Sequence, residues 1–147
     1  MPTKTTPLPK IGNFTGRYRF LSNFFIEPDR THVEGEYQAA KCIIADDALR
    51  ISLLTPTEAK KQGQLVLCRA DWNNVRVEVM HGLVLKKFTD HLALRAQLMA
   101  TGDAELIEGN SRHDTFWGRC RCNVHKGEGW NELGKVLMRV REELRSA

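Results

Sequence analysis

The sequence predicts a single α+β domain that is rich in helices and has a few short strands. Apolar residues recur at helical spacing in several segments, whereas strand-like alternation is short and rare. The 147 residues, 41% of them hydrophobic and 27% charged, suit one core and exclude wholesale disorder. No repeat, low-complexity tract or linker divides the chain. We therefore expect a flexible tail over residues 1–11, rich in Thr, Pro and Lys, and one domain over residues 12–147.

The start of the domain carries strand and turn signals. Large apolar residues alternate with small or basic ones over residues 14–21, which predicts a half-buried strand. Pro28 and Asp29 indicate a turn, after which a helix is expected to begin near His32. Residues 50–54 are apolar and are expected to pack as a connecting segment.

Three helices are expected in the middle of the chain. Residues 55–58 supply a threonine cap, a first-turn proline and a capping-box acid for a short helix that ends near Gly63. Apolar spacing over residues 72–88 predicts a helix of about four turns, capped by Asp71. Residues 92–99 continue in another helix, which a Thr-Gly pair ends.

The last third combines a short strand, a loop and a helix. Residues 104–108 are expected to form the strand. Residues 111–130 show little periodicity and predict a long structured loop, a kind of segment that is usually functional. The final helix is predicted by apolar residues at i, i+4, i+7 and i+11, namely Leu133, Leu137, Val140 and Leu144.

The helix expected after His32 sorts its side chains into two stripes. One stripe is mainly apolar and holds Val33, Tyr37, Ala40 and Ile44. The adjoining stripe holds a carboxylate, an amide and an amine, namely Glu34, Gln38 and Lys41. Such a row is suited to line a polar pocket. The alternative is that Thr31 and Glu34 form a capping box and Lys41 is solvated, and this helix alone favours that alternative.

Charge and hydropathy narrow the partners only slightly. A formal charge of +4 and a pI near 9.0 mildly favour anionic ligands such as phosphates or nucleic acid. No run approaches the ~18 apolar residues of a membrane span, and no apolar segment follows the N-terminal lysines. We therefore expect a cytoplasmic protein without a membrane partner.

The four cysteines lack the spacing of a secreted disulfide scaffold, so reduced thiols are expected. Cys120, Cys122 and His125 form a C-x-C-x-x-H cluster, a pattern that suits metal binding. Structural zinc needs four ligands, and the sequence does not show a fourth. We therefore expect neither a metal nor a cofactor.

Several motifs occur in order from about residue 12 to the C-terminus. They are residues 20–24 (FLSNF), residues 33–41 (VEGEYQAAK), the Asp71-Trp72 pair, and a set made of Asp114, Phe116, Trp117, Gly118, Gly129, Asn131, Leu133, Gly134, Leu137, Met138 and Arg141. In order and spacing they resemble the NADAR family, the YbiA-like proteins, whose name reflects a proposed link to NAD and ADP-ribose chemistry. Trp130 departs from the family pattern without disturbing the neighbouring glycine and asparagine. The resemblance implies a YbiA-like fold.

The resemblance also implies hydrolysis of an N-glycosidic bond. Family members are linked to cleavage of riboflavin-pathway intermediates or to removal of ADP-ribose from guanine bases in DNA. Both reactions break a bond between ribose C1 and nitrogen. The leading expectation is removal of ADP-ribose from ADP-ribosylated guanine, in DNA or in nucleotides. A ribosylamino-pyrimidine of riboflavin synthesis is the alternative substrate.

Such cleavage needs a proton carrier beside C1, and it proceeds through a cationic C1 or through an opened sugar and an imine. Glu34 is the expected proton carrier. Lys41 is expected to attack the opened sugar and form a Schiff base, which requires an amine that is partly neutral. Asp114 is expected to orient the ribose hydroxyls or the amine, its alternative being an ordinary turn residue.

The expected substrate contacts are Asn23, Tyr37, Gln38, Trp72, Trp117, Gly118, Asn131, Arg17 and Arg19. A base would stack on Trp117, whereas Trp72 serves either stacking or the core. The two asparagines either bind substrate edges or serve a turn or helix cap, and the glycine admits the ligand or turns the chain. Phosphate contacts are sought among Arg17, Arg19, Arg112, Arg119 and Arg121, and two of these at the pocket mouth would favour an ADP-ribosylated polynucleotide.

Two further classes of function remain open from the sequence. A binding module would recognise ADP-ribose or NAD without cleaving it. A structural protein would leave the polar stripe in water. The sequence leaves the oligomeric state undetermined.

Overall fold

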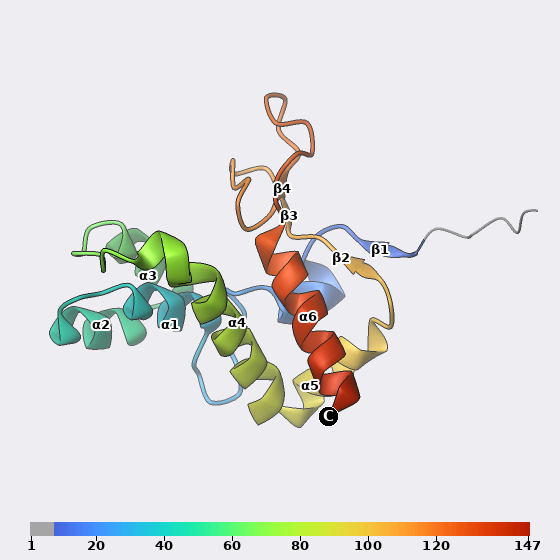
Figure 1. Cartoon of the computed structure of the whole chain (residues 1–147), viewed down its shortest axis with the longest axis horizontal. Helices are drawn as coiled ribbons and strands as arrows, with labels where there is room; N and C mark the ends of the chain where they lie inside the picture. The colour runs from blue at the N-terminus through green and yellow to red at the C-terminus, as the bar shows by residue number, and fades with distance from the viewer. Residues whose placement is uncertain (1–7) are drawn as a thin grey trace, which may run out of the picture.

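The computed structural model describes residues 8–147 and confirms the helix-rich α+β class (Figure 1). The α-helices are α1 (Val33–Ala40), α2 (Ala45–Ser52), α3 (Pro56–Gly63), α4 (Trp72–Asp90), α5 (Leu92–Ala100) and α6 (Glu132–Ser146). A 3-10 helix, η1 (Gly16–Leu21), precedes them. The strands are β1 (Lys10–Ile11), β2 (Glu105–Leu106), β3 (Gly109–Asn110) and β4 (Arg119–Cys120).

The core lies where α4, α5 and α6 meet. Phe88, Leu98 and Val140, one from each helix, are fully buried there. Helices α1, α2 and α3 pack against one another at one end, and α1 also packs on α4 (Figure 1). The predicted loop over residues 111–130 stands beyond the first turn of α6 and contains β4. Within residues 8–147 no helix has both the length and the apolar character to cross a membrane.

The strand predicted over residues 14–21 is wrong, because η1 occupies most of that segment. Gly16 adopts a φ of +58°, and the Tyr18 N–H donates to the Thr15 carbonyl at 3.0 Å. Phe20 and Leu21 are both buried although they are neighbours, whereas a strand would point them to opposite faces. The alternation was therefore too short to distinguish a strand from a tight helix.

Two pairs of parallel strands tie distant segments together. Strand β1 pairs with β2, which confirms a strand within residues 104–108, and β3 pairs with β4. The predicted tail over residues 1–11 is wrong for its last two residues, since Ile11 is buried and pairs with Leu106. The part of that tail over residues 1–7 lies outside the described residues.

The structure confirms the cap predicted for α3 but not the cap predicted for α4, and it contains a helix, α2, that was not predicted. Thr55 Oγ1 accepts from the Glu58 N–H at 3.3 Å and caps α3, as predicted. Helix α2 was missed because it lies at the surface and buries only Ile51. The segment predicted to pack over residues 50–54 therefore contains the end of this helix, and Leu53 beyond it is exposed. Helix α4 begins directly after Asp71, but that carboxylate pairs with Arg69 at 2.6 Å and caps no N–H.

Candidate active site

The start of α1 is fixed by a histidine N-cap and not by a capping box. His32 is the N-cap residue; its Nδ1 accepts from the Gly35 N–H at 2.9 Å and its Nε2–H donates to the Leu54 carbonyl at 2.8 Å. The Thr31 hydroxyl donates to Asp29 at 2.7 Å. The predicted capping box between Thr31 and Glu34 is therefore wrong, and the Glu34 carboxylate is free for another role.

The polar stripe of α1 faces a cavity of about 310 Å³. Its wall is built from α1, α3, α4, the first turn of α6, the segment after η1 and residues between 108 and 117. The lining residues are Ser22, Asn23, Phe24, Glu34, Tyr37, Gln38, Lys41, Lys60, Gln64, Trp72, Arg76, Met80, Glu108, Arg112, Asp114, Trp117 and Leu133. Val33 and Tyr37 are buried as predicted, whereas Ile44 is 45% exposed because α1 ends at Ala40.

Glu34 is a buried acid whose pKa is raised. Only 7% of the residue is exposed, and burial is the main cause of the shift. Gln38 Nε2 donates to Glu34 Oε1 at 2.9 Å, which opposes the shift without cancelling it. The Glu34 N–H donates to the Asn23 carbonyl at 3.1 Å, so α1 and the segment after η1 are held together beside the carboxyl group.

Lys41 lies at the C-terminal end of the same stripe, and its pKa is lowered. Partial burial is the main cause, and the opposing influence of Cys68, Cys42 and Glu34 is smaller. The Lys41 carbonyl accepts from the Arg69 N–H at 2.9 Å, which fixes the backbone below the amine. An acid with a raised pKa and an amine with a lowered pKa thus line one cavity, a combination typical of catalytic sites.

Three aromatic rings form one wall of the cavity. The Tyr37 ring lies 4.9 Å from that of Trp72 and 5.4 Å from that of Trp117, measured between ring centroids. Trp72 is 7% exposed and belongs to the core as well as to the wall, whereas Trp117 is only partly buried. Burial raises the pKa of Tyr37 to about 12, so its hydroxyl stays protonated at neutral pH.

Asp114 is a turn residue that also lines the cavity. Its Oδ1 accepts from the N–H groups of Phe116 at 3.1 Å and Trp117 at 2.9 Å, as a turn residue does. The same residue is part of the cavity wall. The turn therefore positions the Trp117 ring and the Asp114 carboxylate together.

Two predicted substrate contacts, Asn131 and Gly118, are not among the residues that line the cavity, and the structure gives each a packing role. Asn131 is 1% exposed; its Oδ1 accepts from the Glu108 N–H and its Nδ2 donates to the Leu106 carbonyl, both at 2.9 Å. Both ends of this amide thus bind the backbone. Gly118 permits close packing, since a Cβ there would lie 1.9 Å from Glu108 Oε2.

The two predicted arginine contacts also lie outside the cavity. Arg17 stacks on the neighbouring Tyr18 ring, 4.7 Å from its centroid, and does not line the cavity. Arg19 lines an adjoining cleft of about 480 Å³. That cleft shares Lys60 and Arg112 with the cavity and adds Lys61. Of the candidate arginines, Arg19 therefore lines the adjoining cleft and Arg112 lines both the cleft and the cavity, and such guanidinium groups suit anions.

The sequence analysis missed Arg76 and Glu108. Arg76 lies one turn after Trp72 and one turn before Met80, and this i, i+4, i+8 face of α4 was a readable signal. Its guanidinium lies 3.6 Å from the Phe116 ring centroid, and within residues 8–147 its buried Nε has no hydrogen-bond partner. Glu108 sits between Arg112 and Asn110, and burial raises its pKa.

The fold and the cavity define a small helical domain with an enzyme-like site. The NADAR domain matches residues 16–145. N-glycosidase Npun_R5314 of Nostoc punctiforme is 44% identical over 120 residues, which cover 78% of this chain and 74% of that protein. Riboflavin biosynthesis protein VVA0006 of Vibrio vulnificus is 51% identical over 76 residues, 52% of this chain and 19% of that protein.

The solved structure of Escherichia coli YbiA resembles this fold with a TM-score of 0.76 at 30% identity, covering 99% of this chain and 94% of that one. N-glycosidase YbiA of that organism is 40% identical over 76 residues, 52% of this chain and 44% of that protein. The chain belongs to the NADAR family.

Gly63 gives a direct test of how Glu34 is positioned. A Cβ at residue 63 would lie 2.0 Å from Gln38 Oε1, so Gly63→Ala should displace the Gln38 amide from Glu34. Because that hydrogen bond lowers the Glu34 pKa, we expect the pKa to rise further in the variant. Carboxyl-carbon NMR titration measures the shift.

The matched control is Gly82→Ala, since no atom lies within 4 Å of a Cβ there. This control should leave the Glu34 pKa unchanged and stabilise the protein by ~1 kcal/mol, the helix preference of alanine over glycine. Equal Glu34 pKa values in the two variants would contradict the proposed positioning.

Proposed function

We propose that the protein is an N-glycosidase that cleaves the bond between ribose C1 and the nitrogen of a nucleobase. One observation carries the proposal. Glu34 and Lys41 line the same cavity, and the pKa of each is shifted in the direction that favours its neutral form. The names of the relatives in Nostoc and Escherichia, both N-glycosidases, support the same reaction class.

The proposed reaction passes through an opened sugar. When the ribose ring opens, C1 becomes an imine carbon attached to the base nitrogen. The neutral amine of Lys41 adds to C1, and the base leaves as an amine after Glu34 has protonated its nitrogen. Water then hydrolyses the imine between Lys41 and C1, which releases the sugar aldehyde and restores the lysine.

The cavity walls provide recognition for both halves of such a substrate. The Trp117 ring is partly exposed and offers a flat face, and base–aromatic stacking contributes ~1 to 3 kcal/mol per base in single-strand binders. Arg76 also lines the cavity, and its guanidinium group offers N–H donors for a base or ribose oxygen. Asp114 lines the cavity, and its carboxylate suits the ribose hydroxyls.

ADP-ribose on guanine is the substrate that we favour. The cavity alone lies at the small end of the ~300 to 1,000 Å³ range of ligand pockets. The adjoining cleft of about 480 Å³ adds Arg19 and Lys61 beside the shared Lys60 and Arg112. Four cations next to the proposed C1 position suit a diphosphate and the backbone of a modified polynucleotide.

A ribosylamino-pyrimidine of riboflavin synthesis is the second candidate. The Vibrio relative is named a riboflavin biosynthesis protein. The riboflavin biosynthesis protein PYRR of Zea mays is 33% identical over 125 residues. A single ribosyl phosphate would occupy the cavity and leave the basic cleft unused.

Trapping with borohydride tests the covalent step. Incubation with an ADP-ribosylated guanosine oligonucleotide and borohydride should attach the sugar to Lys41, which peptide mass spectrometry locates. Because Lys41 must lose its proton to attack while Glu34 must keep its proton to release the base, the trapping rate should pass through a maximum between the raised pKa of Glu34 and the lowered pKa of Lys41.

The matched pair of variants is Lys41→Arg and Lys86→Arg, the latter at an exposed lysine that pairs with Glu36 and Asp90. Only Lys41→Arg should abolish the adduct. Release of guanine with no adduct would reject the imine route but keep the glycosidase. Ligand bound and recovered intact would instead support an ADP-ribose-binding module.

Substitutions in the basic cleft separate the two substrates. The double variant Arg19→Ala, Lys61→Ala should raise KM for the ADP-ribosylated substrate about tenfold, since a hydrogen bond to a charged group contributes ~1.5 to 3 kcal/mol. KM for a ribosylamino-pyrimidine phosphate should stay unchanged. Steady-state kinetics on both compounds measure the difference, and a loss confined to the pyrimidine would favour the second candidate.

A further inference from the structure

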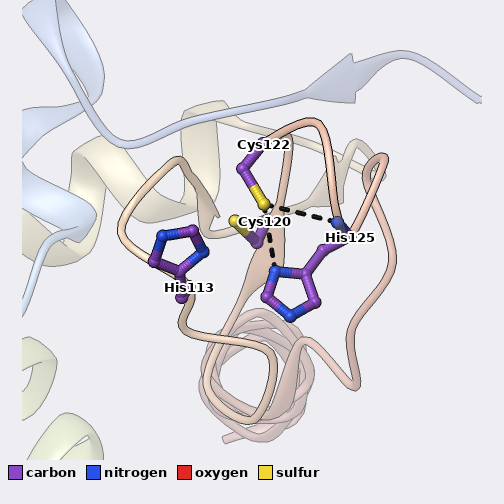
Figure 2. Close-up of side chains that lie close together, drawn as sticks. All are labelled: His113, Cys120, Cys122 and His125. Atoms are coloured by element: carbon purple, nitrogen blue, oxygen red, sulfur yellow. Dashed lines mark hydrogen bonds between the residues drawn. The ribbon is translucent and has the colours of Figure 1, made fainter.

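The loop over residues 111–130 gathers four metal-ligating side chains outside the cavity. His113, Cys120, Cys122 and His125 each offer one ligand atom, and these atoms all lie within 4.8 Å of one another (Figure 2). The sequence showed three of them as a C-x-C-x-x-H cluster. Folding adds His113, seven residues before Cys120, as the fourth.

The backbone holds the cluster in place from two sides. Cys120 is fully buried in β4, where its N–H donates to the Glu128 carbonyl at 3.0 Å. The chain then turns back through Lys126 and Gly127, whose φ values are +53° and +85°. Before that, the Lys126 N–H donates to the Cys122 carbonyl at 2.8 Å, so a turn over residues 122–126 brings His125 back to the cysteines, and the His113 and His125 ring centroids lie 5.4 Å apart.

Cys122 and His125 already interact as neighbours. Cys122 Sγ lies 3.1 Å from His125 Nδ1 and accepts from the His125 backbone N–H at 3.3 Å (Figure 2). A thiolate is the form in which cysteine binds a metal.

We propose that His113, Cys120, Cys122 and His125 bind one zinc ion. Two sulfur and two imidazole ligands in a closed tetrahedral set are typical of structural zinc, and two thiolates balance the charge of the ion. Zinc–ligand bonds of ~2.0 to 2.3 Å place the ligand atoms roughly 3.3 to 3.8 Å apart. The ligand atoms need only a small contraction to reach this spacing, and the exposed His113 ring is able to move.

Zinc binding would stabilise one wall of the cavity. His113 precedes Asp114, and Cys120 follows Trp117 by three residues. A metal that ties His113 to β4 therefore holds the turn that carries both of these wall residues. With four protein ligands the ion has no position for a substrate, so its role is structural and independent of the proposed glycosidase.

Metal analysis of the full chain tests the site without any substrate. The protein, purified under reducing conditions and dialysed, should retain one zinc per chain by elemental mass spectrometry. Replacement by Co²⁺ should give the thiolate charge-transfer and visible d–d bands of a tetrahedral sulfur-ligated site. Removal of zinc by a chelator should lower the Tm.

Variants identify the ligands. Cys122→Ser should abolish the cobalt bands, whereas the matched control Cys68→Ser, at an exposed cysteine outside the cluster, should keep them and its zinc. His113→Ala removes an exposed side chain, so the variant should fold. It should bind zinc at least 10- to 100-fold more weakly, because loss of a residue that only hydrogen-bonds to a ligand already weakens metal binding by that factor.

The proposal is overturned if the reduced wild-type protein binds no zinc when zinc is supplied, or if Cys122→Ser and His113→Ala both retain one zinc with wild-type affinity. Neither result depends on cleavage of a substrate, so each is separate from a failure of the proposed function.

Discussion

The structure depends on how α1 is seated. This helix packs against α2, α3 and α4, and the His32 cap fixes its first turn without using Glu34. Its polar stripe is thereby enclosed by protein, and burial becomes the main cause of both pKa shifts. The same loss of water raises the pKa of the acid and lowers that of the amine, because each charged form loses hydration. The enzymatic interpretation follows from this enclosure more than from the residue types.

Two distant segments close the cavity, and each is held by a buried polar group. The Lys87 ammonium, 2% exposed, donates to the carbonyls of Phe20 at 2.6 Å and Ser22 at 3.2 Å, which fixes the segment that carries Asn23. Burial lowers the pKa of Lys87 to about 8. On the other side, Asn131 binds the backbone of Leu106 and Glu108 and ties the start of α6 to the segment after β2. Replacing either side chain would leave buried partners unsatisfied.

The sequence predicted the helices with a buried stripe and missed features set by tertiary contacts. Helices α4, α5 and α6 followed from apolar spacing, whereas α2 is a surface helix and η1 was mistaken for a strand. The stripe of Glu34, Gln38 and Lys41 was readable because side chains at i, i+4 and i+7 share a face whatever the fold. Glu108 and His113 were not recognised, since folding brings them to their neighbours from other segments, whereas Arg76 shares one face of α4 with Trp72 and Met80 and was readable. The family resemblance pointed to Asp114 and Trp117, which line the cavity. It also pointed to Asn131 and Gly118, whose observed role is in packing.

The central claim is that α1 presents Glu34 and Lys41 to the anomeric carbon of a bound sugar. A crystal structure of the Glu34→Gln variant with ADP-ribose measures this most directly. The account predicts that ribose C1 lies within bonding reach of Lys41 Nζ and beside the residue 34 side chain, with the diphosphate against Arg19 and Lys61. A sugar bound with C1 outside the cavity, or turned toward solvent away from α1, would contradict it.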